Sequence, residues 1–437
     1  MADNCQFLGG LGTQVDASDV NGGGGLHSKV SLAQGGYPTL VEMESYMDAN
    51  GGPLYTATAA SFTGVGPFEE RITKAGEFSA ACVGLYAYIS SATGGWVHLV
   101  LITAADVNSI TFSKVAEAPQ TDVVVNVGGA WNTMQALITN APNPDVNSET
   151  ACFLGQNETL TASLTNFNTL DGVLASNSRV RLSGYGVYPG DGVPVVFTGN
   201  GALNDHGWVS DNIYNVDHEH IRMTDFGVGN TKHGWKLGVT TVCTNCTWTN
   251  CTGDNNTGAG FTTLTLRGCA FINPKSHDNA VLGMIFKDNV AVINPLIYGN
   301  GGNGIKANAA ATRVFVYGGT IDGNGSEGVL VDNAGAEVIL LNTIVSNSGD
   351  ENLKAGTGSI LAVNCNLFNP GSTDDYIDGG GNLSVDPMFA DAGNGDFRLK
   401  PESGLWNKGM PTLDGGYSTM GTWERMQTPH KLDLAGL

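Results

Sequence analysis

Positive charge is scarce in this sequence. The 437 residues include 20 Lys and Arg against 41 Asp and Glu, which gives a formal net charge of −21, and only 14% of all residues are charged. Proteins that bind nucleic acid need a cationic surface that displaces the counterions of the phosphates. We therefore expect no nucleic acid among the partners. The hydrophobic fraction of 41% is sufficient for a folded core, which excludes a disordered acidic tail.

Long apolar runs are also missing. The longest run, residues 96–107, is shorter than the roughly 20 residues that a membrane-spanning helix needs. The first residues lack a basic segment followed by an apolar one, so no signal peptide is predicted. The eight cysteines are too scattered for the disulfide framework of a small secreted protein. We therefore expect that the protein does not insert into a membrane. We also expect that it folds in a reducing cytoplasm.

Glycine, by contrast, is abundant, with 62 residues, about twice the usual frequency. The second half of the chain repeats a short apolar segment followed by asparagine every 20 to 27 residues. Gly and Asn interrupt these segments too often for helices, and the period is typical of a solenoid. The sequence therefore predicts an all-β fold, a parallel β-helix. The repeating asparagines are Asn230, Asn250, Asn273, Asn300, Asn324, Asn347 and Asn369.

These asparagines are predicted to form one ladder, because stacked side-chain amides each supply a hydrogen-bond donor and an acceptor. The residues four and two positions before each asparagine, such as Leu296 and Tyr298, should then face the interior. Cys246, Cys269 and Cys365 share one position of this repeat, which predicts an inward stack of thiols. A Cys246–Cys269 disulfide and a zinc site are weaker alternatives. We expect no metal and no cofactor.

The repeat does not cover the whole chain. Residues 1–120 are predicted to form a separate β-rich attachment region, and residues 121–411 the β-helix. A short amphipathic segment at 132–138 is predicted to be a helix that covers the open end of the solenoid, where strand edges would otherwise pair with other chains. Residues 412–437 form a C-terminal tail.

The coil pattern resembles the right-handed parallel β-helix superfamily, which includes pectate-lyase-like enzymes and phage tailspikes. The stretches VDPMFAD at 385–391 and GNGDFRL at 393–399 are similar to a closing segment found after bacterial β-helix repeats, although residues 404–409 depart from its pattern. This resemblance, with the N-terminal region, implies a structural protein on the virion surface of a bacteriophage. Such a protein would be a homotrimer that docks on capsid or tail proteins through its N-terminus.

A polysaccharide-degrading enzyme, either a glycosidase or a pectate-lyase-like lyase, is the alternative. A glycosidase needs two carboxylates on one face, and a lyase needs a basic residue beside carboxylates that bind Ca²⁺. Lys287 and Lys306 are the basic residues in plausible coils for a lyase. A bacterial adhesin is a third possibility. The carboxylates considered for a glycosidase are Asp322, Asp332, Glu337, Asp350 and Glu351.

Six residues are candidates for binding host surface polysaccharide, and no catalytic residue is assigned. The triplet His-Gly-Trp occurs twice, 27 residues apart, so that the two tryptophans could stack and bind sugar rings. The other interpretation places both tryptophans in the core. Two carboxylates flank a histidine in the cluster at 217–220, where they could hold Ca²⁺ against an acidic glycan. The six candidates are His206, Trp208, His233, Trp235, Asp217 and Glu219.

Overall fold

The computed structural model describes most of the chain. The described residues are 44–48, 55–64, 69–83, 86–94, 96–113, 118–127, 133–140, 143, 149–154, 157–167, 169–172, 179–184, 192–199, 205–227, 232–369, 374–409 and 418–421. Among these residues, no helix has the length and hydrophobicity needed to cross a membrane.

The N-terminal region forms a closed antiparallel barrel with the strand order β2-β3-β6-β5-β4-β7. Its interior is apolar and includes Phe62, Ile89 and Phe112. The last strand ends at Val127, so the barrel extends past residue 120. The barrel strands are β2 (Tyr55–Gly64), β3 (Glu69–Thr73), β4 (Tyr86–Ser91), β5 (Trp96–Ala105), β6 (Ser109–Ser113) and β7 (Gln120–Val127).

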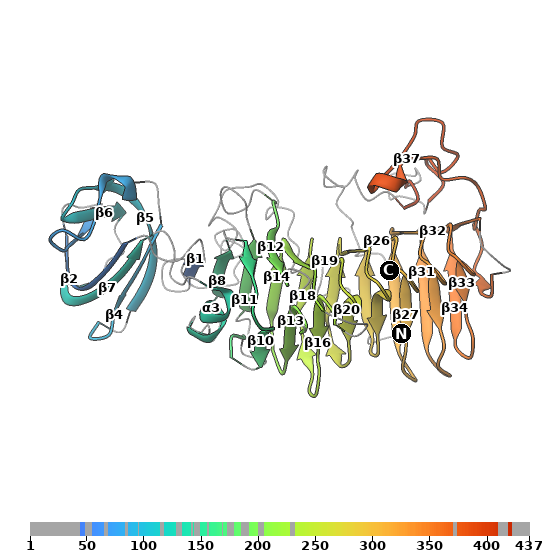
Figure 1. The fold of residues 1–437 in the computed structure, drawn as a ribbon, viewed down its shortest axis with the longest axis horizontal. Helices are drawn as coiled ribbons and strands as arrows, with labels where there is room; N and C mark the ends of the chain where they lie inside the picture. Colours follow the sequence, from blue (N-terminus) through green and yellow to red (C-terminus); the bar gives the residue numbers. More distant parts are fainter. Residues whose placement is uncertain are drawn as a thin grey trace.

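The rest of the chain winds into three parallel sheets, which each coil visits in turn (Figure 1). Sheet 1 contains β1 (Glu44–Asp48), β8 (Glu149–Leu154), β11 (Arg179–Gly184), β14 (Val216–Glu219), β18 (Thr247–Thr249), β22 (Ala270–Ile272), β25 (Val290–Ile293), β28 (Arg313–Tyr317), β31 (Glu337–Leu341), β34 (Ser359–Val363) and β36 (Ile377–Asp378). Sheet 2 contains β9 (Glu158–Thr159), β12 (Val195–Thr198), β15 (Ile221–Thr224), β19 (Thr252–Asp254), β23 (Lys275–His277), β26 (Leu296–Tyr298), β29 (Thr320–Asp322), β32 (Ile344–Ser346) and β35 (Asn366–Phe368).

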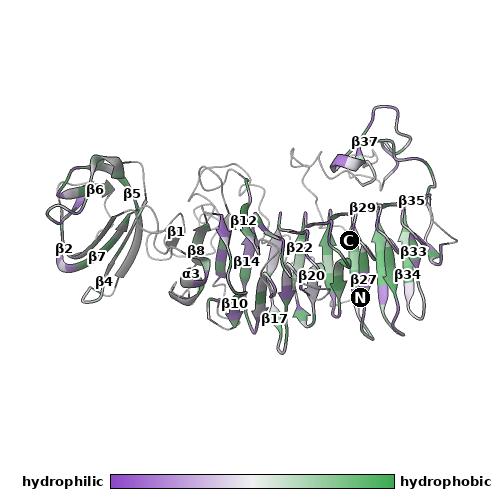
Figure 2. Cartoon of the chain, in the orientation of Figure 1, coloured by the Kyte–Doolittle hydropathy of each residue, from purple (hydrophilic) through white to green (hydrophobic). Residues whose placement is uncertain are grey.

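Sheet 3 contains β10 (Leu164–Phe167), β13 (Trp208–Asp211), β16 (Trp235–Leu237), β20 (Ala259–Thr263), β24 (Leu282–Phe286), β27 (Ile305–Ala307), β30 (Val329–Val331) and β33 (Leu353–Lys354). The strands β17 (Cys243–Thr244) and β21 (Leu266–Arg267) form a separate two-stranded parallel sheet between neighbouring coils. The predicted parallel β-helix with a separate N-terminal β domain is confirmed. The strand residues near β27 and β34 are more hydrophobic than those near β10 and β14 (Figure 2).

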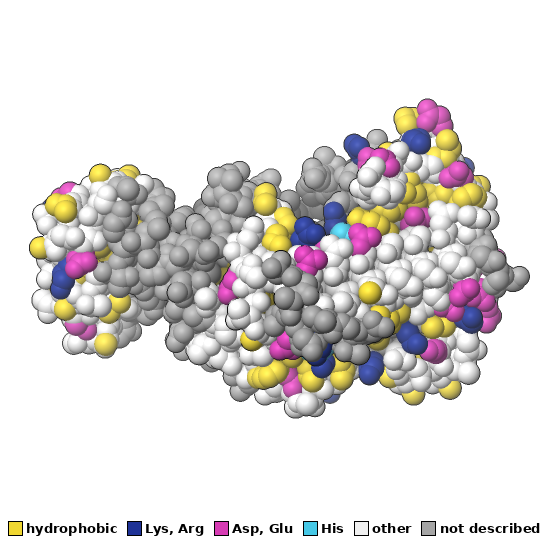
Figure 3. All heavy atoms as spheres, in the orientation of Figure 1, with side chains coloured by type: hydrophobic (Ala, Val, Ile, Leu, Met, Phe, Trp, Pro, Cys, Tyr) yellow, Lys and Arg dark blue, Asp and Glu magenta, His cyan; other side chains and the backbone are white. Residues whose placement is uncertain are grey.

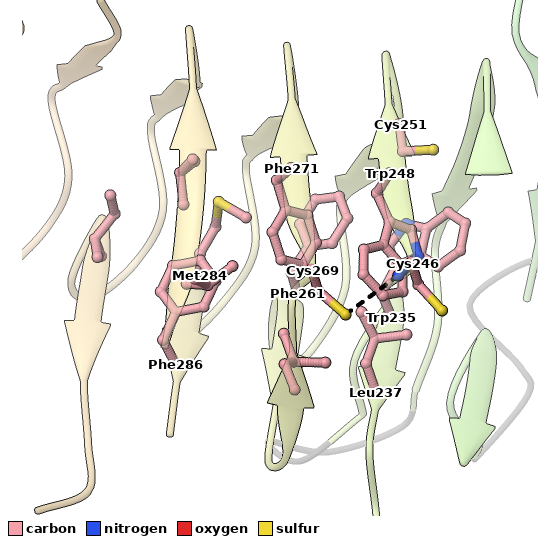
Figure 4. Packing of buried hydrophobic residues seen from close by; sticks show 14 of the residues in the cluster. Trp235, Leu237, Cys246, Trp248, Cys251, Phe261, Cys269, Phe271, Met284 and Phe286 are labelled. Atoms are coloured by element: carbon pink, nitrogen blue, oxygen red, sulfur yellow. Dashed lines mark hydrogen bonds between the residues drawn. The ribbon is translucent and has the colours of Figure 1, made fainter. Parts of the chain in front are cut away.

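Like side chains stack on like inside the solenoid. The parallel register aligns Trp208 with Trp235 and Trp235 with Phe261, and the rings of each pair are stacked. Trp248 and Phe271 form a second aromatic stack in sheet 1, with ring centroids 4.9 Å apart (Figure 4). A fully buried side chain of this size stabilises the fold by about 2 kcal/mol or more. These stacks continue into aliphatic residues of the later coils.

The predicted stack is confirmed for Cys246 and Cys269, which occupy equivalent positions before β18 and β22 of sheet 1. It is wrong for Cys365, which precedes β35 of sheet 2 and is equivalent to Cys251 before β19, because the sequence repeat combines different turns. Cys246, Cys269 and Cys365 are buried free thiols, and the Sγ of Cys269 lies 3.4 Å from the backbone nitrogen of Cys246 (Figure 4). The Cys246–Cys269 disulfide is therefore absent from this structure. Burial raises the pKa of Cys365 to about 11, so this thiol is protonated at neutral pH.

The single asparagine ladder is a wrong prediction, because the sequence repeat combines several turns. Asn250 and Asn273 belong to a partly exposed ladder that continues to Asn294, not to Asn300. Asn300 and Asn324 belong to a buried ladder in another turn. A third ladder joins Asn369 to Asn347. Asn230 lies outside the described residues.

The buried ladder consists of Asn256, Asn279, Asn300 and Asn324. Each amide nitrogen donates to the side-chain oxygen of the next member, over 2.9 to 3.0 Å. Because Asn300 occupies this turn, the predicted inward orientation of the residues four and two positions before it is wrong. Leu296 and Tyr298 point outward, and Ile297 between them points into the core.

The predicted capping helix is α3 (Met134–Asn140). Met134, Leu137 and Ile138 are buried in the same core as the first coils. The carboxylate of Glu158 accepts a hydrogen bond of 2.9 Å from the backbone nitrogen of Met134, which satisfies one of the free N–H groups at the start of the helix. The helix thus covers the N-terminal end of the solenoid core.

After the last coil, the chain folds back over the outside of sheet 2. We call residues 379–409 and 418–421 the C-terminal arm; it contains the antiparallel pair β37 (Phe389–Asp391) and β38 (Asp396–Leu399). Leu399, Leu405 and Met420 of the arm form an apolar cluster with Ile344 of β32. The arm rises above β26 and β32 in Figure 1.

Replacement of His218 by Phe should make the stability of the protein less dependent on pH. Burial among Trp208, Trp235 and Trp248 lowers the pKa of His218 to about 4 from 6.5. Between these values the unfolded chain binds a proton that the folded chain does not, so stability falls as the pH falls. We expect the native protein to lose about 3 kcal/mol more than His218→Phe between pH 7 and pH 4. Urea unfolding at both pH values measures this, and equal losses would contradict it.

Replacement of Asn279 by Ala should break the buried ladder. The side chain accepts hydrogen bonds from Asn256 and donates to Asn300 and to the carbonyl of Gly253, all at about 3 Å. Because the partners stay buried without water, we expect a loss of about 3 kcal/mol in the free energy of unfolding. Asn369→Gly, at an exposed ladder and a left-handed backbone position, is the control and should cost under about 1 kcal/mol. Equal losses of unfolding free energy in the two variants, measured by urea unfolding, would contradict the difference between the buried and the exposed ladder.

Candidate functional site

The outer face of sheet 2 carries two rows of side chains, which are polar except for the buried Leu296. In each short strand the middle residue points into the core, and the residues on either side of it point outward. The parallel register stacks equivalent outward residues along the axis of the solenoid. The first row contains Arg222, Thr252, Lys275 and Leu296, and the second contains Thr224, Asp254, His277 and Tyr298.

Arg222 and Asp254 form a bidentate ion pair at the start of these rows. The Nε of Arg222 donates to one carboxylate oxygen over 2.8 Å, and a terminal nitrogen donates to the other over 2.5 Å. Thr224 and Asn255 donate to the same carboxylate. Asp254 is fully buried, whereas 38% of the Arg222 side chain is exposed. The carboxylate therefore holds the guanidinium in one orientation at the surface.

His277 and Tyr298 lie side by side on the next two coils. Their rings are parallel, with centroids 4.7 Å apart and an angle of 6° between the planes. The Nδ1 of His277 is 2.8 Å from a carboxylate oxygen of Asp278, in the turn after β23. A carboxylate only accepts hydrogen bonds, so the neutral ring donates from Nδ1 and its Nε2 keeps a free electron pair. This arrangement makes Nε2 a candidate proton acceptor.

The hydroxyl of Tyr298 is held in its protonated form. Burial, and then the negative charges of Asp278 and Asp254, raise its pKa to about 12, and the cation of Arg222 offsets only part of this increase. At neutral pH this hydroxyl is protonated, as that of an ordinary tyrosine is, and it can donate a proton. A proton acceptor and a proton donor therefore stand next to each other on one face.

Lys275 adds a second cation to the face. It occupies the same row as Arg222, two coils further along, on the order of 10 Å away at the usual strand spacing. Figure 3 shows His, Lys or Arg and acidic side chains together on the upper side of the solenoid, next to the C-terminal arm. The face thus carries two cations, Arg222 and Lys275, together with the carboxylates of Asp254 and Asp278.

The two tryptophans that were candidate glycan-binding residues lie in the core. Trp208 and Trp235 are 0% exposed, so their rings offer no surface to a sugar. This corrects their assignment as binding residues and agrees with the core interpretation. The physical reason is the stacking of equivalent positions, because the coils that follow carry Phe261 and Met284 at this position.

The other four candidates lie at two other places. His206 and His233 stack on each other in the turn before sheet 3, and each Nδ1 accepts a backbone N–H of the following coil. Asp217 and Glu219 are on the outside of sheet 1, where they face Arg179 and Arg181. No group of three His, Cys, Asp or Glu side chains suited to a metal occurs in the part of the chain that the structure describes.

The basic residues considered for a lyase are also elsewhere. Lys306 lies in sheet 3 and forms an ion pair with Asp332. Asp322 does lie in the second row of sheet 2, but Ser346 and Asn347 hold its carboxylate by hydrogen bonds. The sequence analysis did not identify the two outward rows of sheet 2. Alignment of the coils on Met223, Ser276 and Ile297 as inward residues would have placed the outward residues of each row at equivalent positions.

No protein-family model and no curated protein sequence matches the chain. Among solved structures, the chain is similar to a pectate lyase, with a TM-score of 0.47 and 16% identity over 67% of this chain and 91% of that one. It is also similar to the A-module of a mannuronan C-5 epimerase from Azotobacter vinelandii, with a TM-score of 0.29 and 15% identity over 56% and 85% of the two chains. A periplasmic alginate epimerase gives a TM-score of 0.28 and 12% identity over 60% and 83%.

All three TM-scores are below 0.5, so these likenesses carry no argument about the function of this chain. The identities are too low to transfer a residue or an activity, so a function has to come from the side chains of the outer face.

Replacement of Asp278 by Asn should lower the pKa of Tyr298 below about 12. The carboxylate of Asp278 opposes the formation of a tyrosinate anion beside it, and the neutral amide does not. The titration is followed by the ultraviolet absorbance of tyrosinate, as the difference between each protein and the same protein with Tyr298→Phe. Asp350→Asn, at an exposed turn, is the control and should leave this titration unchanged. An unchanged titration in Asp278→Asn would contradict the assigned cause.

Proposed function

We propose that the protein is a polysaccharide lyase that acts on a polymer of uronic acids. The observation that carries this proposal is the presence of two cations, a histidine and a protonated tyrosine on one outward face of sheet 2. A lyase must abstract the proton at C5 of a uronate, next to a carboxylate. Loss of that proton requires neutralisation of the carboxylate charge, a proton acceptor, and a proton donor for the leaving oxygen.

Arg222 and Lys275 supply the positive charge in this proposal. Because they lie in the same row along the axis, a chain of sugars that follows the axis passes both. Arg222 is already fixed by Asp254, so its guanidinium needs little reorganisation when it meets a substrate carboxylate. An acidic polymer would otherwise be repelled by the net charge of −21.

His277 and Tyr298 transfer the protons. The Nε2 of His277 takes the proton from C5, and the electron pair of the C5–H bond forms the double bond between C4 and C5 as the C4–O4 bond breaks. The hydroxyl of Tyr298 gives its proton to the leaving oxygen. The stacking of the two rings, with centroids 4.7 Å apart, supports a reaction in which acceptor and donor act on the same side of one sugar.

The expectation of a structural virion protein remains a prediction, as do its homotrimeric state, its capsid or tail partners and its location on the virion surface. The polar face of sheet 2 supports the enzyme, because a histidine held by a carboxylate beside a tyrosine with a shifted pKa is an arrangement that is common at functional sites.

Replacement of Tyr298 by Phe should abolish most of the turnover of a polyuronate. The variant keeps the ring but lacks the proton donor, and we expect kcat to fall by about 10² to 10⁴. The assay follows the ultraviolet absorbance of the unsaturated uronate formed from polygalacturonate or polymannuronate. Tyr317→Phe is a matched control, because Tyr317 is a half-buried outward tyrosine on sheet 1. Absence of turnover by the unmodified protein on both polymers would reject the lyase.

A further inference from the structure

The C-terminal arm covers the outer face of sheet 2 beyond Tyr298. On the three coils after Tyr298, the outward residues of the first row are Thr320, Ile344 and Asn366. Each of them contacts the arm. Thr320 donates a hydrogen bond of 2.6 Å to the carbonyl of Gly421, and Asn366 exchanges two hydrogen bonds with the backbone of Val385. The arm is thus attached along successive coils.

The arm ends against Tyr298 itself. Phe397 of β38 lies with its ring centroid 4.8 Å from that of Tyr298, and Phe389 of β37 packs edge to face against Phe397, with centroids 5.0 Å apart. A Cβ atom added to Gly395 would come within 2.8 Å of the Tyr298 hydroxyl, so the turn of the arm lies directly beside that oxygen. Phe397 is almost fully buried, which makes this contact a packed one.

Resting on the proposed function, we propose that the arm is the end wall of the substrate groove and that the enzyme acts only at one end of a polyuronate chain. The rows that carry Arg222, Lys275 and His277 run along the solenoid axis, so a polymer bound to them runs along the axis as well. At Tyr298 such a polymer meets Phe397. The reacting sugar is therefore at or next to the chain end, and a chain that continues in both directions does not fit.

The test measures binding and so does not depend on turnover. Hexamers of mannuronate and of galacturonate are prepared with a bulky fluorophore at the reducing end or at the non-reducing end. Binding to the full chain carrying His277→Gln is compared with that of the unlabelled hexamers. We expect the fluorophore at one of the two ends to weaken binding at least about tenfold, and the other to have little effect. Equal binding of both labelled forms overturns the end wall.

Two variants distinguish an end wall formed by Phe397 from a general destabilisation of the C-terminal arm. Phe397→Ala removes the ring beside Tyr298 and should reduce the difference between the two labelled forms. Leu405→Ala removes an equally buried side chain of the arm, in the cluster around Ile344, and should preserve that difference. Loss of the difference in both variants, or in neither, contradicts the role of Phe397.

The lyase and the end wall fail in different ways. A difference between the two labelled forms without any turnover by the unmodified protein would reject the lyase and keep the wall. Turnover that releases long fragments from the start, with a rapid fall in viscosity, would keep the lyase and overturn the wall. Absence of binding by every hexamer would overturn both.

Discussion

The hydrogen bonds between successive coils determine nearly every other feature of this molecule. They run in parallel register, so each side chain lies about 4.8 Å from the equivalent side chain of the next coil. Any property placed at one position is therefore repeated along the axis. Inside, this repetition produces the aromatic and thiol stacks. At the turns it produces the amide ladders, and on the outside of sheet 2 it brings together charged and titratable residues that are far apart in the sequence.

The interior could be predicted from the sequence because apolar strands recur with an asparagine nearby. The stack of Cys246 on Cys269, and the core interpretation of Trp208 and Trp235, followed from comparing equivalent positions, whereas Cys365 was assigned to the wrong turn. The barrel strands and α3 were also recognisable from local alternation and amphipathicity. Inside the solenoid an equivalent side chain is buried for the same reason in every coil, which leaves a repeated signal.

The outer site could not be predicted in the same way. Asp254, His277 and Tyr298 occupy one row, but 30, 23 and 21 residues separate the successive members from Thr224 onward, since the turns differ in length. The asparagines were a misleading guide because Asn273 and Asn300 belong to different ladders. Outward residues are also free to differ from coil to coil, so a functional cluster carries no repeat. Only the strand register brings such residues together.

The buried cysteines give each part of the solenoid its own chemical reporter. Cys152, Cys246 and Cys365 lie in coils spread along the axis, and all are protected from reagents while their coils are closed. In a linear array whose repeats contact only their neighbours, segments open with different free energies. The rate at which each thiol is alkylated, resolved by mass spectrometry, therefore maps the order in which the coils separate.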